Sequence, residues 1–223
     1  MATDNVVGVD FSHLYEATPT GEVVQEVTID QGTTTEQPTA MQRMGTNTTH
    51  KLGAWSTGAE TTTSASEEFL FNGYLFEGTA TIEVRLSLYD RGVEGSSAGF
   101  VFTIDPTMAK MSVRILDWPW ASSNNTLSMS IPIDPPFTSV TQRNNFPQVG
   151  TTAYILRGQY DDQTQTTIHV LSAAEVDDSR TIQVSALVDP RASTLTLQFP
   201  FFGANLTYDP GTLYNLNNRR QLF

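Results

Sequence analysis

From residue 69 onward, the chain is dominated by short runs in which apolar and polar residues alternate. The clearest run covers residues 81–88, where every second position is apolar. A period of two is typical of a strand with one buried face and one solvated face. Comparable runs recur every ~10–15 residues and helical periodicity is almost absent, so the pattern predicts about ten strands and an all-β fold.

Turn signals separate these runs and favour antiparallel pairing. Four runs end in Asp-Pro, at residues 105–106, 134–135, 189–190 and 209–210. Proline cannot donate to a ladder and pushes the preceding residue toward extended geometry, so each Asp-Pro predicts a strand end followed by a turn. Asn72-Gly73 lies between two aromatic runs and predicts a hairpin. We therefore expect an antiparallel β-sandwich of immunoglobulin-like or jelly-roll type.

The first third of the chain lacks this pattern. Residues 23–29 form one plausible strand, whereas residues 30–68 are rich in Thr, Gly, Ser and Glu. So long a stretch without clear elements is uncommon inside a compact domain. We predict an irregular N-terminal arm over 1–68 with one strand, a β-sandwich core over 69–214 and a polar tail over 215–223.

The composition of the chain limits which classes of binding partner and which kinds of site are possible. The formal net charge is −12 and the only lysines are Lys51 and Lys110, so there is no basic stripe to bind nucleic acid. Cations, neutral polysaccharide or a basic protein partner stay compatible with this charge. The chain has no cysteine, which excludes disulfides and thiolate metal sites. No apolar run approaches the ~20 residues of a membrane-spanning helix.

The segment from 117 to 125 is the densest local cluster of possible binding residues. Trp118 and Trp120 flank a proline in a loop between two expected strands, and Asn124 and Asn125 follow. Aromatic faces stack on sugar rings, so the four residues are candidates for a ligand-binding platform. Burial of a tryptophan at the end of the sandwich is the structural alternative, and we favour it.

A second aromatic cluster lies near the C-terminus. Phe199, Phe201 and Phe202 are interrupted by a proline, and Tyr208 follows shortly after. This run is not an alternating strand, so it predicts either packing at an edge or end of the core, which we favour, or a protein-protein interface.

One acidic loop is a candidate calcium-binding site. Asp161 and Asp162 form the best single loop for a cation that prefers oxygen ligands, although a solvated hairpin turn explains them equally well.

The three histidines have no metal-ligand spacing, and no nucleophile elbow, phosphate loop or dinucleotide motif is present. We expect no enzyme and no cofactor, with calcium as the one candidate ion.

Two blocks of the sequence carry a family resemblance. Asp117-Trp118-Pro119-Trp120 with Asn125 and Leu127, followed by a final strand ending in Tyr208-Asp209-Pro210, resembles uncharacterised secreted or cell-surface β domains of unicellular eukaryotes. The resemblance implies an extracellular, surface-attached module. The chemistry of those domains is itself unknown, so the resemblance assigns no catalytic residue.

Together these observations predict a non-enzymatic extracellular or cell-surface module for adhesion or assembly through protein-protein contacts, including self-assembly. Three alternatives stay open. A carbohydrate-binding, lectin-like module would expose Trp118 or Trp120. A structural subunit of a capsid, filament or appendage would use residues 1–68 to reach a neighbour. A glycosidase or lyase would present a cleft with two carboxylates about 5–10 Å apart.

Overall fold

The structure is a computed structural model. It describes residues 13–28, 41–47, 67–76, 79–89, 91–98, 100–106, 108–133, 137–145, 150–158, 165–177 and 180–215. These residues form strands β1 to β17 and no α-helix, and every strand pairing among them is antiparallel. The predicted all-β, sandwich-like class is therefore confirmed, with more strands than the ten or so expected. No described helix has the length and apolarity to cross a membrane.

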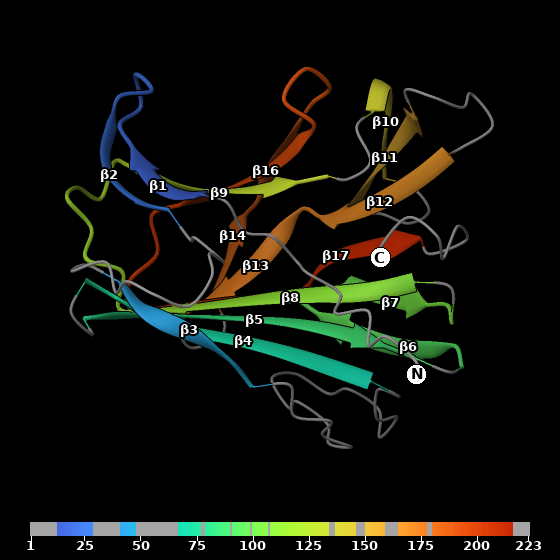
Figure 1. Ribbon diagram of the computed structural model, residues 1–223, viewed down its shortest axis with the longest axis horizontal. Helices are drawn as coiled ribbons and strands as arrows, with labels where there is room; N and C mark the ends of the chain where they lie inside the picture. The colour runs from blue at the N-terminus through green and yellow to red at the C-terminus, as the bar shows by residue number, and fades with distance from the viewer. Residues whose placement is uncertain are drawn as a thin grey trace, which may run out of the picture.

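The smaller sheet forms the upper layer in Figure 1. Its order is β15-β16-β9-β1-β2, which leaves β15 and β2 at its two edges. The strand bounds are β1 (His13–Ala17), β2 (Val23–Thr28), β9 (Thr126–Pro132), β15 (Ser185–Asp189) and β16 (Thr194–Pro200).

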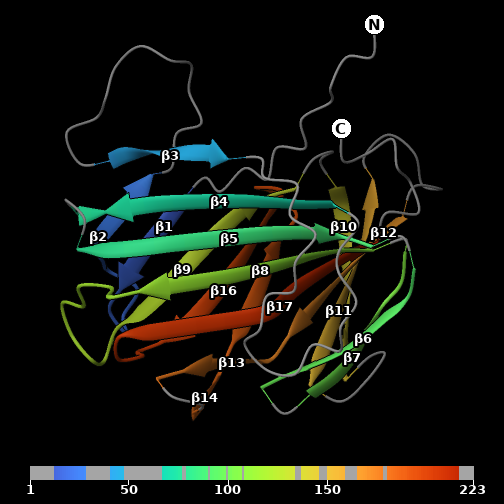
Figure 2. The same ribbon diagram turned by 90° about the horizontal axis from the view of Figure 1, so that it is seen from below.

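The larger sheet forms the lower layer and then rises along one side of the molecule (Figures 1 and 2). Its main path runs β10-β11-β12-β17-β8-β5-β4-β3, and β13 joins β17 and β14 off this path. The bounds are β3 (Met41–Asn47), β4 (Glu67–Leu75), β5 (Ala80–Leu88), β8 (Met108–Leu116), β10 (Phe137–Asn144), β11 (Thr151–Gly158), β12 (Gln165–Leu171), β13 (Ala173–Val176), β14 (Arg180–Gln183) and β17 (Asn205–Asn215). A separate hairpin consists of β6 (Val93–Ser97) and β7 (Phe100–Ile104).

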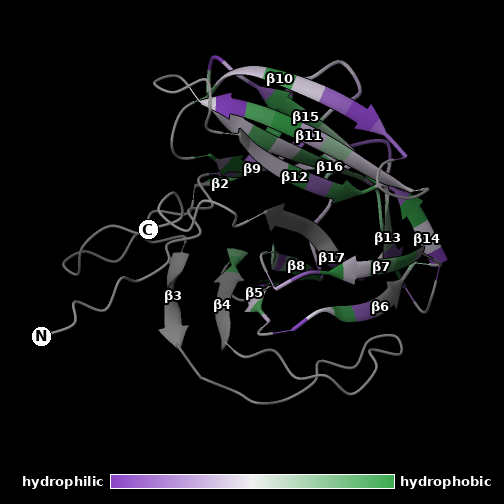
Figure 3. Ribbon diagram, turned by 90° about the vertical axis from the view of Figure 1, so that its right-hand side faces the viewer, coloured by the Kyte–Doolittle hydropathy of each residue, from purple (hydrophilic) through white to green (hydrophobic). Residues whose placement is uncertain are grey.

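The core lies between the two sheets and is built from cross-strand rows. In the smaller sheet, Leu14, Met129 and Leu197 stand opposite one another on neighbouring strands. In the larger sheet, Val113 stands opposite both Val84 and Tyr208. All of these side chains are buried, as the period-two pattern requires. In Figure 3 the polar residues of β10, by contrast, mark an edge strand whose side chains are mostly exposed.

Side chains also bridge the two sheets directly. The rings of Phe199 on β16 and Tyr208 on β17 meet edge to face at 5.5 Å between centroids. The hydroxyl of Tyr154 on β11 donates to the carbonyl of Ala186 on β15 at 2.8 Å. Burial raises the pKa of the Tyr154 hydroxyl, so it stays a donor across the ordinary pH range.

The structure differs from the expected organisation at the N-terminus. Residues 13–28 were expected within an arm that has one strand, but they form β1 and β2 of the smaller sheet. Leu14 and Val27 from these strands are part of the core. Pairing with β9, distant in sequence, stabilises a segment whose local pattern is weak. Most of residues 29–66 and the tail after Asn215 lie outside the described residues.

The turn signals had mixed outcomes. Strands β7 and β15 end at or just before Asp105-Pro106 and Asp189-Pro190, as expected. Residues 134–136 lie outside the described residues. The expected stop at Asp209-Pro210 is wrong, because β17 continues through it: the register with β8 jumps from Tyr208 to Thr212. The residues skipped by this irregularity have no ladder partner on β8, so proline's missing N–H costs no bond there.

The expected Asn72-Gly73 hairpin is also wrong. Both residues lie inside the continuous strand β4, where Asn72 stands opposite Glu83 and Gly73 opposite Ile82 of β5. Pairing along the whole of β5 outweighs the local turn preference of these two residues.

Candidate functional site

A buried carboxylate organises one end of the sandwich. Glu16 lies two residues after Leu14 on β1, and the period of a strand directs both side chains into the molecule. The residue is 0% exposed. A lone carboxylate in such a place costs much free energy, so its partners decide whether it is stable there.

Donors from two segments surround this carboxylate. Five groups direct hydrogens at its two oxygens: Gln25 Nε2 from β2, Trp118 Nε1 (3.1 Å), the backbone N–H of Ala121 (3.0 Å), the backbone N–H of Ser122 (3.4 Å) and Asn125 Nδ2. We call Glu16 with these five residues the Glu16 cluster. Its hydrogen bonds occupy the lone pairs of the carboxylate with groups of the same chain.

The protonation state of Glu16 follows from two opposing effects. Burial raises the pKa of the carboxyl, whereas the hydrogen bonds from Asn125, Trp118, Ala121 and Gln25 lower it. The hydrogen bonds prevail, and the pKa lies below its ordinary value of 4.5. Glu16 is therefore an anion at neutral pH and is held as a hydrogen-bond acceptor.

The segment over 117–125 adopts a fixed path around this anion. Asp117 has φ of +53° and its N–H donates to the carbonyl of Ala204 at 2.7 Å. Gln25 also donates to the carbonyl of Pro119 at 2.9 Å, and Asn125 N–H donates to the carbonyl of Ser122 at 3.1 Å. Edge strand β2 is thereby joined to this loop.

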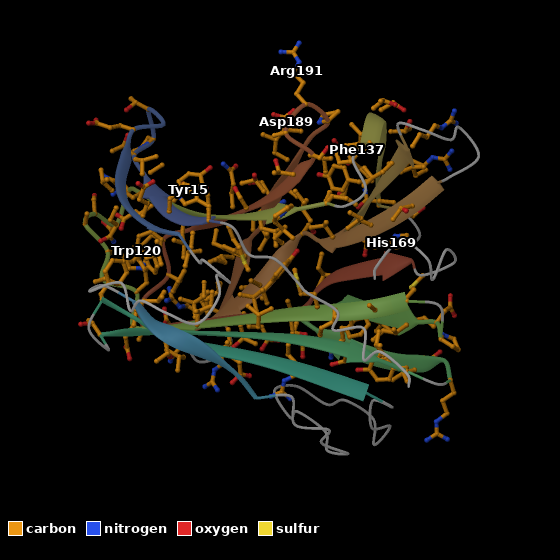
Figure 4. The ribbon with its side chains drawn as sticks, viewed as in Figure 1. Tyr15, Trp120, Phe137, His169, Asp189 and Arg191 are labelled. Atoms are coloured by element: carbon orange, nitrogen blue, oxygen red, sulfur yellow. The ribbon has the colours of Figure 1, made fainter. Side chains whose placement is uncertain are left out.

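The structure separates the four residues of the expected binding platform. Trp118 is only 3% exposed and meets Phe76 edge to face, so its ring is not available to stack on a sugar. Asn125 is buried on Glu16, and Asn124 is exposed. Trp120 is partly buried and lies at the left-hand end of the molecule in Figure 4. Core packing, the favoured alternative, describes Trp118.

The C-terminal aromatic cluster divides in the same way. Phe199, Phe202 and Tyr208 are at most 1% exposed, so in this fold they are core residues and offer no interface. Phe201 is 40% exposed. It contacts Trp120 at 5.2 Å between ring centroids. We call Trp120 and Phe201 the aromatic patch.

A second carboxylate fixes the backbone that carries Phe201. Asp177 accepts hydrogen bonds from the N–H groups of Gly203 (2.7 Å), Ala204 (2.8 Å) and Asn205 (2.9 Å), and from Arg180 (2.9 Å). Desolvation raises the pKa of Asp177, but the donors from Asn205, Gly203, Ala204 and Arg180 outweigh it and lower the pKa. The aromatic patch therefore lies on two loops, one held by Glu16 and the other held by Asp177 just after Phe201.

The candidate calcium loop, with Asp161 and Asp162, lies outside the described residues. Among the residues that are described, no group of three His, Asp or Glu side chains is placed to hold a metal ion.

Sequence reasoning missed Glu16 and Asp177 as organising residues. Four of the five donors to Glu16 lie more than a hundred positions away in the chain, as the separation of 109 residues from Asn125 illustrates. One signal was available: in the run from His13 to Ala17, a glutamate occupies the position where alternation from Leu14 calls for a buried apolar residue.

Comparison with known proteins gives no relative from which to assign this site. No family model matches the chain, and no curated protein and no solved structure matches it. The resemblance to secreted β domains of unicellular eukaryotes stays a prediction.

Proposed function

We propose that the protein is a non-catalytic extracellular or cell-surface module that assembles through protein-protein contacts made by edge strand β2. The observation that carries this proposal is the exposure of two adjacent valines on that strand, Val23 at 46% and Val24 at 42%. Strand β2 is the last of its sheet among the described strands. An edge strand with apolar side chains is a template for pairing with another chain.

The aromatic patch extends this surface. Gln25 of β2 donates to the carbonyl of Pro119, so the edge strand and the loop that carries Trp120 are in direct contact. Phe201 then packs on Trp120 from the neighbouring loop. Because the Glu16 cluster and Asp177 fix both loops, a partner would bind them with little loss of conformational freedom.

The same contacts support a non-catalytic role for Glu16. Its carboxylate is fully buried and accepts hydrogen bonds from five groups of its own chain. A general base or nucleophile needs a lone pair that reaches the substrate. The lone pairs of Glu16 instead accept hydrogen bonds that hold the loop carrying Trp120 of the aromatic patch.

The partner we propose is a second copy of the chain. An antiparallel edge strand pairs with a copy of itself about a two-fold axis, which is the commonest symmetry of protein dimers. Glu22 and Glu26 flank the valines on an exposed strand, and each copy carries a net charge of −12. Repulsion between copies therefore opposes the contact, and salt weakens that repulsion.

The test compares one charge placed on each edge of the smaller sheet. Val24→Glu puts a further carboxylate on β2, and Leu187→Glu is the matched control on the opposite edge β15, where Leu187 is 62% exposed. We expect Val24→Glu to weaken dimerisation measured by light scattering roughly tenfold or more, about 1.4 kcal/mol. Leu187→Glu should leave it nearly unchanged. Equal effects, or loss only in Leu187→Glu, would contradict the assignment to β2.

A further inference from the structure

Strands β8 and β17 enclose a charge pair that the proposed function does not use. Lys110 Nζ lies 2.9 Å from Asp209 Oδ1. Lys110 is 2% exposed and Asp209 is 4% exposed. Alternation along β8 puts Lys110 on the face opposite to the core residues Met111 and Val113.

The surroundings of this pair are unusual for two ionic side chains. Removing both charges from water costs several kcal/mol per ion, which their attraction only partly restores. The pair is thus held where the amino group of Lys110 and the carboxyl group of Asp209 lie in contact and are shielded from water.

We propose that Lys110 and Asp209 form an intramolecular isopeptide bond. A proton passes from the ammonium to the carboxylate, and the neutral Nζ then attacks Cγ of Asp209. The Cγ–O bond breaks, the departing hydroxyl takes a proton from the nitrogen, and water leaves. An amide remains between the two side chains, and nothing is oxidised or reduced. No external reagent is required, because the exchanged protons come from the pair itself.

The surroundings favour the attack. Held reactants gain the advantage of proximity, and Nζ of Lys110 lies 2.9 Å from Oδ1, the oxygen bonded to the Cγ carbon that it would attack. The hydroxyl of Ser112, two residues after Lys110 on β8, donates to the same oxygen, Oδ1. A hydroxyl that donates to this oxygen draws electron density from the carboxyl group and makes Cγ more open to attack by the amine.

The irregularity in β17 explains how Asp209 reaches this position. Asp209 follows Tyr208 at the point where the register with β8 is interrupted. Such an irregularity re-aims a side chain that regular pairing would place elsewhere. The resulting bond would cross-link two adjacent strands distant in the sequence, in a chain that has no cysteine for a disulfide. Cross-links that close long loops restrict the unfolded chain most.

The experiment is intact-mass measurement of the folded, full chain after denaturation, followed by peptide mapping. The expected mass is lower than the sequence mass by one water molecule, and the digest should contain a branched peptide joining Lys110 to Asp209. Lys110→Arg should restore the full mass, while Lys51→Arg, which changes the only other lysine, should keep the deficit.

Full sequence mass in the unmodified chain would overturn the proposal, and so would a water loss that maps to any other residues. Because the unmodified chain decides the outcome, a variant that fails to fold leaves the test intact. Dimerisation is measured separately, so the isopeptide bond and the proposed function can fail independently.

Discussion

Glu16 is the residue that most clearly breaks the hydrophobic pattern of its strand. Its inward position on β1 follows from the same alternation that buries Leu14. A charge at that position is stable because five donors reach it. The residue therefore acts as the acceptor that determines the path of the loop over 117–125.

Replacing this acceptor should be costly. Glu16→Gln substitutes an amide NH₂ for an oxygen and leaves it facing the donors of Gln25 and Asn125. We expect a loss of about 3 kcal/mol in the free energy of unfolding, since hydrogen bonds to charged groups are worth about 1.5–3 kcal/mol each. Urea unfolding followed by circular dichroism measures this directly.

The matched control for that substitution is Glu26→Gln. Glu26 forms a surface ion pair with His13 at 2.9 Å and its side chain is 60% exposed. Exposed pairs contribute about 0–1 kcal/mol, so the control should unfold nearly as the unmodified chain does. Similar losses in both variants would contradict the role given to Glu16.

Because the pKa of Glu16 is lowered in the folded state, the free energy of unfolding depends on pH. The unfolded state takes up a proton near the ordinary value of 4.5, at a pH where the folded state still excludes it. The stabilisation by Glu16 is therefore complete above that value and is lost as the pH falls through the lower pKa of the folded state. The stability difference between the unmodified chain and Glu16→Gln should shrink on acidification over this range. A difference that is constant or grows toward acid would contradict the assignment.

At the scale of elements, the loop after β16 depends on a close approach between Asp177 and Gly203. A Cβ atom built on Gly203 would lie 2.5 Å from Asp177 Oδ2. That carboxylate is fixed by three backbone N–H groups and Arg180, so it has little freedom to move aside. Only glycine, which has no Cβ atom, fits at position 203 without displacing this carboxylate.

Gly203→Ala should consequently destabilise the protein by about 1–3 kcal/mol, the usual cost of overpacking. Gly92→Ala is the control, because the nearest atom to its added Cβ is the carbonyl oxygen of Ile104 at 3.9 Å, an ordinary contact. Thermal unfolding of the two variants separates the effects. If the two variants melt at the same temperature, the close approach carries no energetic weight.

Sequence patterns predicted the type of most elements and failed where distant pairing decides the structure. Alternation in 81–88 correctly indicated strand β5, and Asp189-Pro190 correctly ended β15. Asn72-Gly73 and Asp209-Pro210 failed because β4 and β17 are each paired with long central strands that override local turn chemistry. The partners of Glu16 were equally beyond prediction, since they come from segments brought together only by the fold.

At the scale of the whole molecule, two sheets of different size enclose one core and leave β2 and β15 as the described edges of the smaller sheet (Figure 1). Aromatic residues that a sequence pattern suggested as binding surfaces mostly serve this core, as Trp118 and Phe199 illustrate. The remaining two, exposed Phe201 and partly buried Trp120, border the edge strand through the contact of Gln25 with Pro119. This arrangement supports assembly through that end.

Sedimentation velocity of the unmodified chain over a range of concentrations, at low and at high salt, tests this account most directly. Because the two copies carry like charge, with −12 on each, we expect a monomer-dimer equilibrium that shifts toward dimer as salt rises from about 0.05 to 0.5 M. A strict monomer at every concentration and both salt levels would contradict assembly through β2.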